Sequence, residues 1–455
     1  MSGKTLIKDA ILVTCDEAVD VPPRGDILVD GSSIAAVGSD VGDVGAEVID
    51  GAGMIAIPGL IDSHRHTWQA PIRGTAVDLS FLQYLQTIHE VLVPLFEASD
   101  VGAGVRLGAA EALNAGITTT YDYCHVIQTP EEADAAVAAL KESGARVVFG
   151  HGGRREGTSM PDWMVESELT HPPDVRRVRD EHFPANDGLV TMAMAIRGAE
   201  YSTLEVTRAD VELARELDPP VTLHIGCGTF GPKYRAVERM GEAGLLDAGM
   251  NFVHCSMLAD EEFELMAASG VRACFAPVQE MTQGNGPLGL GRLRAAGLRF
   301  GLGVDIVTAT GGDLFTQMRC ALAQERARLY DPMVLGGTDP PEVDYSSAEA
   351  LNAITIDGAH VCGLEDRVGS LTPGKAADIV LLKQGLNLAP LTDPVASVVS
   401  AADISNVDTV FVDGKTVKRN GELVGVDLER LVSDAADTQL RLYEAAGWAE
   451  AGRFS

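Results

Sequence analysis

The sequence predicts an α/β protein in which a (β/α)8 (TIM) barrel is joined to a small composite β-sandwich domain built from both termini. Three observations predict this fold. Short apolar runs of strand character alternate with helical stretches through the middle of the 455-residue chain. The two ends consist instead of β-rich runs separated by turns. Polar side chains, many of them histidines, follow the middle runs, as they do at the mouth of a parallel barrel.

The two ends of the chain share one sequence pattern, in which β-rich runs are separated by turn residues. Val, Ile and Leu stand beside Asp-Gly and Gly-Ser pairs in "GDILVDGSSIAAVG" near the start, and a matching β-rich run with Asp-Gly, "VDTVFVDGKTVKRNGELV", returns near the end. This pattern is typical of hairpins. We therefore expect residues 1–57 and 366–430 to form the composite sandwich, residues 58–365 the barrel, and residues 431–455 a C-terminal helical segment.

Strand and helix candidates alternate in the middle of the chain. The strand candidates are 54–62, 116–125, 145–153, 188–198, 219–228, 250–256, 270–277 and 298–308. The helix candidates between them are 99–115, 130–143, 203–217, 233–247, 259–269 and 313–329. Crossover helices imply parallel strands, whose carboxyl ends meet at one mouth.

The composition is that of an ordinary globular protein, with 46% hydrophobic and 22% charged residues. A net charge of −31 argues against a nucleic-acid or anionic-membrane partner, because phosphates would be repelled. The chain shows no signal peptide and no apolar run of about 18 residues that would suggest a membrane span. Seven scattered cysteines without CxxC spacing indicate reduced thiols, so a cytoplasmic location is expected.

One set of polar residues at the predicted strand ends predicts a metal site. A single histidine at a strand end is usually structural, but imidazoles grouped with a carboxylate suit Zn²⁺ or Fe²⁺ and leave room for water. The set is His64, His66, His224, His254 and Asp305.

The motifs around these residues resemble those of the amidohydrolase superfamily, in its branch of mononuclear aminohydrolases and chlorohydrolases. That branch includes deaminases of cytosine, guanine and 8-oxoguanine, and triazine hydrolases. "PGLIDSHRH" (58–66) is similar to the strand-one motif, "TLHIGCG" to strand five, "FVHCS" to strand six and "LGVDIVT" to strand eight. Arg73-Gly74 and "DLSFLQYL" (78–85) also match, and the similarity covers nearly the whole chain.

The resemblance implies a ligand set and a reaction. His64, His66, His224 and Asp305 would hold one divalent metal ion, Zn²⁺ or Fe²⁺. His254 would face the metal-activated water, and Asp305 would also act as the general base. The implied reaction is attack of metal-bound hydroxide on an sp² carbon of a small nitrogen heterocycle, with hydrolytic deamination as the first expectation. A homo-oligomer is expected.

The chain departs from this branch where deaminases carry their proton relay. They usually have His-x-x-Glu on strand five, whereas Cys227 stands at the glutamate position, and Met257 replaces a second histidine after strand six. Three hypotheses remain open. Glu280 or Glu200 could supply the carboxylate from another strand end. The reaction could need no relay, as in displacement of chloride or an alkylthiol, or in ring opening of a cyclic amide. The protein could instead be a non-catalytic metal-binding scaffold.

Candidate substrate contacts lie near the same strand ends. Trp68 and Gln69 follow the two histidines of strand one and are expected at the mouth, where an aromatic face and an amide edge suit a flat heterocycle. Cys227 is expected to line the pocket, because no basic neighbour in the sequence lowers its pKa. His125 ends strand two and either reaches substrate or supports the site from behind.

Arg197 and Glu200 end strand four and either touch substrate or pair with each other. The segment 151–187 is expected to be a loop insertion over the mouth, and "HGGRREG" (151–157) would serve as a lid or as an arginine donor for a substrate carboxylate. Three further histidines are expected to lie away from the site: His89, His171 and His182.

Overall fold

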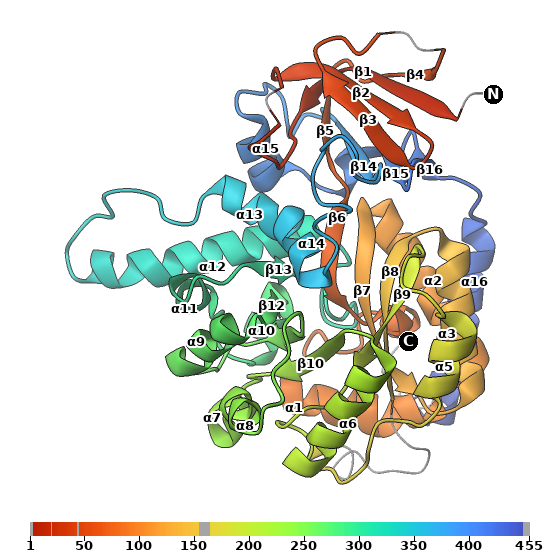
Figure 1. The fold of residues 1–455 in the computed structure, drawn as a ribbon, viewed down its shortest axis with the longest axis vertical. Helices are drawn as coiled ribbons and strands as arrows, with labels where there is room; N and C mark the ends of the chain where they lie inside the picture. The colour runs from red at the N-terminus through yellow and green to blue at the C-terminus, as the bar shows by residue number, and fades with distance from the viewer. Residues whose placement is uncertain (1–2, 20, 43–44, 154–163, 449–455) are drawn as a thin grey trace.

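The computed structural model describes residues 3–19, 21–42, 45–153 and 164–448, and it confirms the expected fold class. Figure 1 shows a barrel surrounded by helices, with a β domain at one end in which red N-terminal and blue C-terminal strands lie side by side. No helix in the described ranges is long and apolar enough to cross a membrane.

In the described part of the chain, eight parallel strands follow one another in chain order around the barrel. They are β6 (Leu60–Arg65), β7 (Ile117–Ile127), β8 (Arg146–Gly153), β9 (Val190–Ala195), β10 (Val221–Ile225), β11 (Asn251–His254), β12 (Arg272–Phe275) and β13 (Phe300–Leu302). The intervening helices are α2 (Ala98–Asn114), α3 (Pro130–Ser143), α5 (Val175–His182), α6 (Leu204–Leu217), α8 (Ala236–Glu242), α9 (Asp260–Ser269), α11 (Leu290–Ala295) and α12 (Leu314–Leu335).

Short helical segments follow the carboxyl ends of several strands and build the mouth. They are η1 (Thr67–Ile72), α1 (Phe81–Tyr84), η2 (Leu85–Leu92), η3 (Val93–Leu95), α7 (Phe230–Tyr234) and α10 (Pro277–Gln283). The remaining helices are α13 (Ser347–Ala353), α14 (Ile356–Cys362), α15 (Pro394–Ala401), η4 (Ile404–Asn406) and α16 (Leu428–Ala445). Helix α16 supports η1 from outside, because Gln439 Nε2 donates to Pro71 O at 2.9 Å.

The described residues of the β domain form one mixed sheet of nine strands. They are β1 (Lys4–Leu12), β2 (Arg24–Asp30), β3 (Ser33–Gly38), β4 (Glu47–Asp50), β5 (Met54–Pro58), β14 (Ile379–Lys383), β15 (Val407–Val412), β16 (Lys415–Arg419) and β17 (Glu422–Leu423). The two ends of the chain meet where β14 pairs antiparallel with β5. Alternating apolar residues of both ends, such as Ile7 and Ile379, share one buried cluster.

A buried ion pair joins this sheet to the barrel. Arg146, the first residue of β8, donates two hydrogen bonds of 3.0 Å to Asp378, which precedes β14. Because Arg146 lies at the amino end of its strand, the β domain covers the end of the barrel opposite the mouth. The segments that follow the carboxyl ends of the strands therefore form the mouth.

Two predicted elements differ from the structure. The run 54–62 was expected to be one barrel strand, but it divides at Gly59 into β5 of the mixed sheet and β6 of the barrel. A Cβ at Gly59 would lie 2.1 Å from Thr118 Oγ1, so the chain can pass from one sheet to the other there only with glycine. The helix predicted at 233–247 is interrupted at Arg235, whose φ of 46° is left-handed.

The barrel closes between its first and last strands at their carboxyl ends. Asp305 N donates to His64 O at 2.9 Å, and His66 N donates to Asp305 O at 2.8 Å. Gly303 permits this approach, since a Cβ there would lie 2.5 Å from His64 O. The closure therefore uses the backbone of three predicted metal ligands.

We expect Gly303→Ala to lower the free energy of unfolding by about 1–3 kcal/mol, as overpacked interiors do. The bound-metal content should fall as well, because the displaced chain carries Asp305. Thermal unfolding and elemental analysis measure the two effects. Gly38→Ala is the control, since the nearest neighbour of its Cβ would be Val41 Cγ1 at 3.9 Å. Equal stability and metal content in the two variants would contradict the prediction.

Candidate functional site

Five side chains from four regions of the barrel converge at its mouth. His64 and His66 come from the end of β6, His224 from β10, His254 from the end of β11, and Asp305 follows β13. Asp305 Oδ1 lies 3.2 Å from the Nε2 atoms of both His64 and His66. His224 Nε2 lies 3.3 Å from His64 Nε2. The structure thus brings together the whole set that the sequence placed at strand ends.

The backbone holds two of these residues in unusual conformations. His254 has a φ of 80° and Asp305 a φ of 64°, in the left-handed region that non-glycine residues seldom adopt. Such conformations cost of order 1 kcal/mol each and persist only where the surrounding structure fixes them. The barrel-closing hydrogen bonds fix Asp305.

Burial sets the protonation states of the ligand set. It lowers the pKa of His64 to about 4 and that of His224 well below the ordinary histidine value. Burial opposes ionisation of Asp305, but its contacts with the imidazoles of His64 and His66 outweigh that effect and hold its pKa well below the usual range. At neutral pH, His64 and His224 are therefore neutral and Asp305 is a carboxylate, which are the forms that bind a cation.

A second hydrogen bond orients His66. Its Nδ1 lies 2.7 Å from Tyr123 O, and because a carbonyl oxygen only accepts, Nδ1 carries the proton. The Nε2 atom is then the lone-pair donor that faces the other ligands. This is the usual arrangement behind a metal-binding histidine.

The donor set fits one zinc ion. Ligand atoms about 2.0–2.2 Å from a tetrahedral zinc lie roughly 3.3 Å apart. The separations of 3.2 Å and 3.3 Å match that spacing. Among the described residues, His64 groups with His66 and His224, and also with His254 and Asp305, closely enough to share one ion.

His254 is held by a buried carboxylate from the neighbouring strand end. Its Nδ1 lies 3.0 Å from Glu280 Oε1, and its Nε2 lies 4.0 Å from Asp305 Oδ2. Glu280 in α10 also accepts from Ala276 N at 2.8 Å. Burial disfavours the charged imidazole, but the hydrogen bond with Glu280 outweighs it and raises the pKa of His254. Glu280 does not line the cavity, so it acts on the site through His254.

The strand-five cysteine lines the cavity with a neutral thiol. Cys227 is fully buried at the cavity surface, and burial raises its pKa well above the ordinary thiol value, so it is no thiolate nucleophile. Glu200 does not line the cavity. Its carboxylate accepts from Gly226 N at 2.6 Å and Cys227 N at 3.0 Å and thereby fixes the turn after β10. Burial raises the pKa of Glu200 to about 7.

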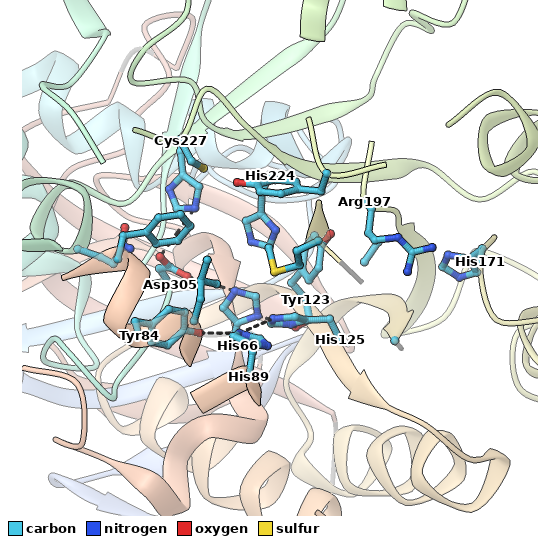
Figure 2. Close-up of a pocket in the computed structure, with 18 of the residues that line it drawn as sticks. His66, Tyr84, His89, Tyr123, His125, His171, Arg197, His224, Cys227 and Asp305 are labelled. Carbon is cyan, nitrogen blue, oxygen red and sulfur yellow. Dashed lines mark hydrogen bonds and ion pairs between the residues drawn. The ribbon is translucent and has the colours of Figure 1, made fainter. Parts of the chain in front are cut away.

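The cavity over the ligand set has two polar walls of different chemistry (Figure 2). One wall is formed by aromatic rings: Tyr84 and His125 both contact His89, with Tyr84 Oη 3.2 Å and His125 Nε2 3.3 Å from His89 Nε2. The other wall contains Arg197 and His171, which Figure 2 shows on the side away from Asp305. Asp210 lies beside His171, because its Oδ1 accepts from His171 N at 2.8 Å, and Met164 and Tyr201 also line the cavity.

Four expectations about individual residues were wrong. Trp68 and Gln69 do not line the mouth but are fully buried behind it. Gln69 accepts from Thr308 and donates to Tyr84 Oη at 2.7 Å, so it supports the wall that contains Tyr84 from behind. His89 and His171 were expected away from the site, yet both line the cavity. His182 does lie elsewhere and pairs with Asp134.

The loop expected over the mouth is described only in part, since residues 154–163, including most of "HGGRREG", lie outside the described ranges. Gly153 and Met164, which flank that gap, both line the cavity. Tyr84 and Asp210 were missed by the sequence reasoning. Tyr84 lies within the recognised "DLSFLQYL", whereas Asp210 stands in the middle of a helix and gives no local signal.

With the barrel and its ligand set described, the class of the protein is clear. Residues 55–417 match the model of the amidohydrolase family, and the chain belongs to that family. It is 28% identical over 443 residues to 5'-deoxyadenosine deaminase of Methanothermobacter thermautotrophicus. The match covers 94% of this chain and 97% of the relative.

Two solved structures share the fold. An atrazine chlorohydrolase mutant from Arthrobacter aurescens, complexed with zinc and atraton, has a TM-score of 0.83 and 24% identity, and the match covers 96% of this chain and 100% of that one. An adenosine deaminase from Xanthomonas campestris with bound zinc has a TM-score of 0.81 and 24% identity, covering 97% of this chain and 98% of that one.

Substitution of single ligands should separate metal binding from cavity lining. His66→Ala and Asp305→Ala are each expected to lower zinc affinity by more than about 100-fold, since even residues behind the ligands contribute that much. Cys227→Ser should retain full zinc content, because the thiol lines the cavity without ligating. Elemental analysis of the purified variants gives the answer, and loss of zinc from Cys227→Ser would show that the thiol is a ligand.

Proposed function

We propose that this protein is a zinc-dependent hydrolase that removes an exocyclic amino group from a nitrogen heterocycle. The observation that carries the proposal is the convergence of Asp305 and His254 on one point beside three further imidazoles, with Glu280 behind His254. The deaminase name of the 28% identical relative supports this reaction class. A zinc ion bound here would supply Lewis acidity, which makes water nucleophilic near neutral pH.

The protein's own residues would move the protons. Asp305 directs Oδ1 towards His64 and His66 and Oδ2 towards His254, so Oδ2 is the atom that would accept a proton from the attacking water. Addition to an sp² carbon makes that carbon tetrahedral, and an amino group then needs a proton to leave. His254 Nε2 faces the same space and would hold that proton.

The Glu280–His254 pair would replace the missing strand-five glutamate. With Nδ1 donating to Glu280, the imidazole keeps its orientation while Nε2 gains and loses a proton. The carboxylate stabilises the imidazolium without contacting substrate, so Glu280 is proposed as a positioning residue. His254 and Asp305 are proposed as the catalytic ones.

A second candidate is displacement of a leaving group that departs without a proton, such as chloride. Cys227 favours it, because a neutral thiol with a raised pKa stands where a proton-carrying glutamate would otherwise line the cavity. Among the described residues, Asp210 and Asp305 are the only carboxylates in the cavity lining.

A parallel screen distinguishes the two candidates. Zinc-loaded protein is incubated with amino-substituted purines, pyrimidines and triazines and with their chloro counterparts, while released ammonia and chloride are measured. Deamination predicts ammonia from at least one amino compound, and loss of that signal in Asp305→Ala. Chloride release without ammonia would support the second candidate. Full zinc content without either product would contradict both.

Glu280→Gln tests the proposed pair. The amide keeps an oxygen that can accept from His254 Nδ1 and Ala276 N but removes the charge. We expect kcat to fall about 100-fold, within the usual range for acid–base catalysis. KM should stay within about twofold, because the residue does not touch substrate. Glu264→Gln, an exposed change of the same kind in α9, is the control. A wild-type kcat in Glu280→Gln would eliminate the pair.

A further inference from the structure

The side chain of Tyr84, the last residue of α1, lines the cavity on the side of Asp305 (Figure 2). Its hydroxyl oxygen has two nitrogen neighbours, Gln69 Nε2 at 2.7 Å and His89 Nε2 at 3.2 Å. A hydroxyl has one hydrogen to donate and can accept two hydrogen bonds. The roles of the two nitrogen atoms therefore decide where the hydrogen of Tyr84 points.

Gln69 donates to Tyr84. The side-chain carbonyl of Gln69 accepts from Thr308 Oγ1 at 3.0 Å, so its amide nitrogen faces the phenol. Gln69 and Thr308 are both fully buried behind the cavity, which fixes the amide in this orientation. An amide nitrogen offers only hydrogens, so Tyr84 Oη is the acceptor at this contact.

His89 also donates to Tyr84, and the tautomer of His125 shows why. His125 Nδ1 lies 3.3 Å from Tyr123 O, which can only accept, so Nδ1 carries the proton. Burial holds the pKa of His125 well below the ordinary histidine value, so the ring is neutral and its Nε2 carries a lone pair. His89 Nε2 lies 3.3 Å from that atom and must provide the hydrogen between them. The same N–H group faces Tyr84 Oη.

The hydroxyl of Tyr84 therefore accepts from both neighbours and keeps its own hydrogen for the cavity. Burial, and to a lesser extent the negative charge of Asp305, raises the pKa of Tyr84 above the ordinary phenol value, so the group is protonated at neutral pH. Tyr123 differs, although it also lines the cavity, because its hydroxyl donates to Ile196 O at 2.8 Å.

The proposed reaction has a use for such a donor. When water adds to the carbon that bears the amino group, its oxygen bonds to that carbon and its proton passes to Asp305. The π pair of the adjacent ring C=N bond moves onto the ring nitrogen, which then carries negative charge. Once His254 has protonated the amino group, the same pair re-forms the C=N bond as ammonia leaves. A donor fixed beside the ring nitrogen stabilises the charge while it is present.

We infer that Tyr84 donates a hydrogen bond to the ring nitrogen next to the reacting carbon, and that it is a third catalytic residue beside His254 and Asp305. The phenol keeps its hydrogen throughout. This inference rests on the proposed function, which places the reacting carbon beside Asp305. It narrows the substrate class to heterocycles in which a ring nitrogen without a hydrogen adjoins the amino-bearing carbon. Cys227, at the strand-five position, offers only a weak thiol donor.

Tyr84→Phe removes the hydroxyl and keeps the ring. On the amino compound that gives the most ammonia in the screen, we expect kcat/KM to fall about 100-fold, as when one donor to a developing charge is deleted. Zinc content by elemental analysis should match wild type. Tyr330→Phe is the control, because Tyr330 lies in α12 and its hydroxyl contacts Asp344 N at 3.1 Å, away from the cavity lining. A wild-type kcat/KM in Tyr84→Phe would overturn the inference.

A binding comparison separates a direct contact from a merely structural role of the hydroxyl. Zinc-loaded protein is titrated by calorimetry with purine and 1-deazapurine, and with 2-pyrimidinone and 2-pyridone. These compounds have no amino group to release, and the second of each pair has C–H in place of the ring nitrogen. We expect wild type to bind at least one nitrogen compound about tenfold more tightly than its partner, as one hydrogen bond predicts.

In Tyr84→Phe this ratio should fall to about twofold or less, whereas Tyr330→Phe should keep it. A structural role would weaken both members of a pair equally. Wild-type protein that binds no compound or shows no preference, or an unchanged ratio in Tyr84→Phe, would overturn the inference. A Tyr84-dependent ratio without ammonia from any amino compound would refute deamination and leave the contact standing.

Discussion

The two backbone hydrogen bonds between Asp305 and the chain at His64 and His66 are the constraint on which the rest of the site depends. They close the barrel and set the spacing of three proposed metal ligands at the same time. Any displacement of β13 relative to β6 would therefore separate Asp305 Oδ1 from both imidazoles. Gly303 makes this contact possible, and the left-handed backbone at Asp305 turns its carboxylate inward.

The fold and the ligand set could be predicted from the sequence because both follow from local patterns. Apolar runs fix where strands begin and end, and parallel strands bring their carboxyl ends together. His64, His66, His224, His254 and Asp305 all stand at such ends, so their convergence needed no knowledge of side-chain packing. Gly59 shows the limit of this reasoning, since one continuous apolar run there serves two different sheets.

The walls of the cavity could not be predicted in the same way. His89 and Asp210 lie on helical segments, and His171 lies on a loop, so no strand register places them near the metal centre. Their positions depend on how each segment packs over the barrel. Trp68 illustrates the opposite case. It follows a ligand directly in the sequence, yet η1 turns its side chain into the core against Phe96.

The buried carboxylates explain how the site can contain Cys227 at the strand-five position. Glu200 binds the two amides of the turn that presents Cys227, and Glu280 binds His254. Neither reaches the cavity, so each controls the position of a neighbour. A cysteine side chain is shorter than a glutamate, so space beside Asp305 remains for substrate. In the proposed reaction, proton transfer to a leaving group depends on His254, whose Nε2 lies 4.0 Å from Asp305 Oδ2. The proposed chemistry is therefore set by how firmly Glu280 holds that imidazole.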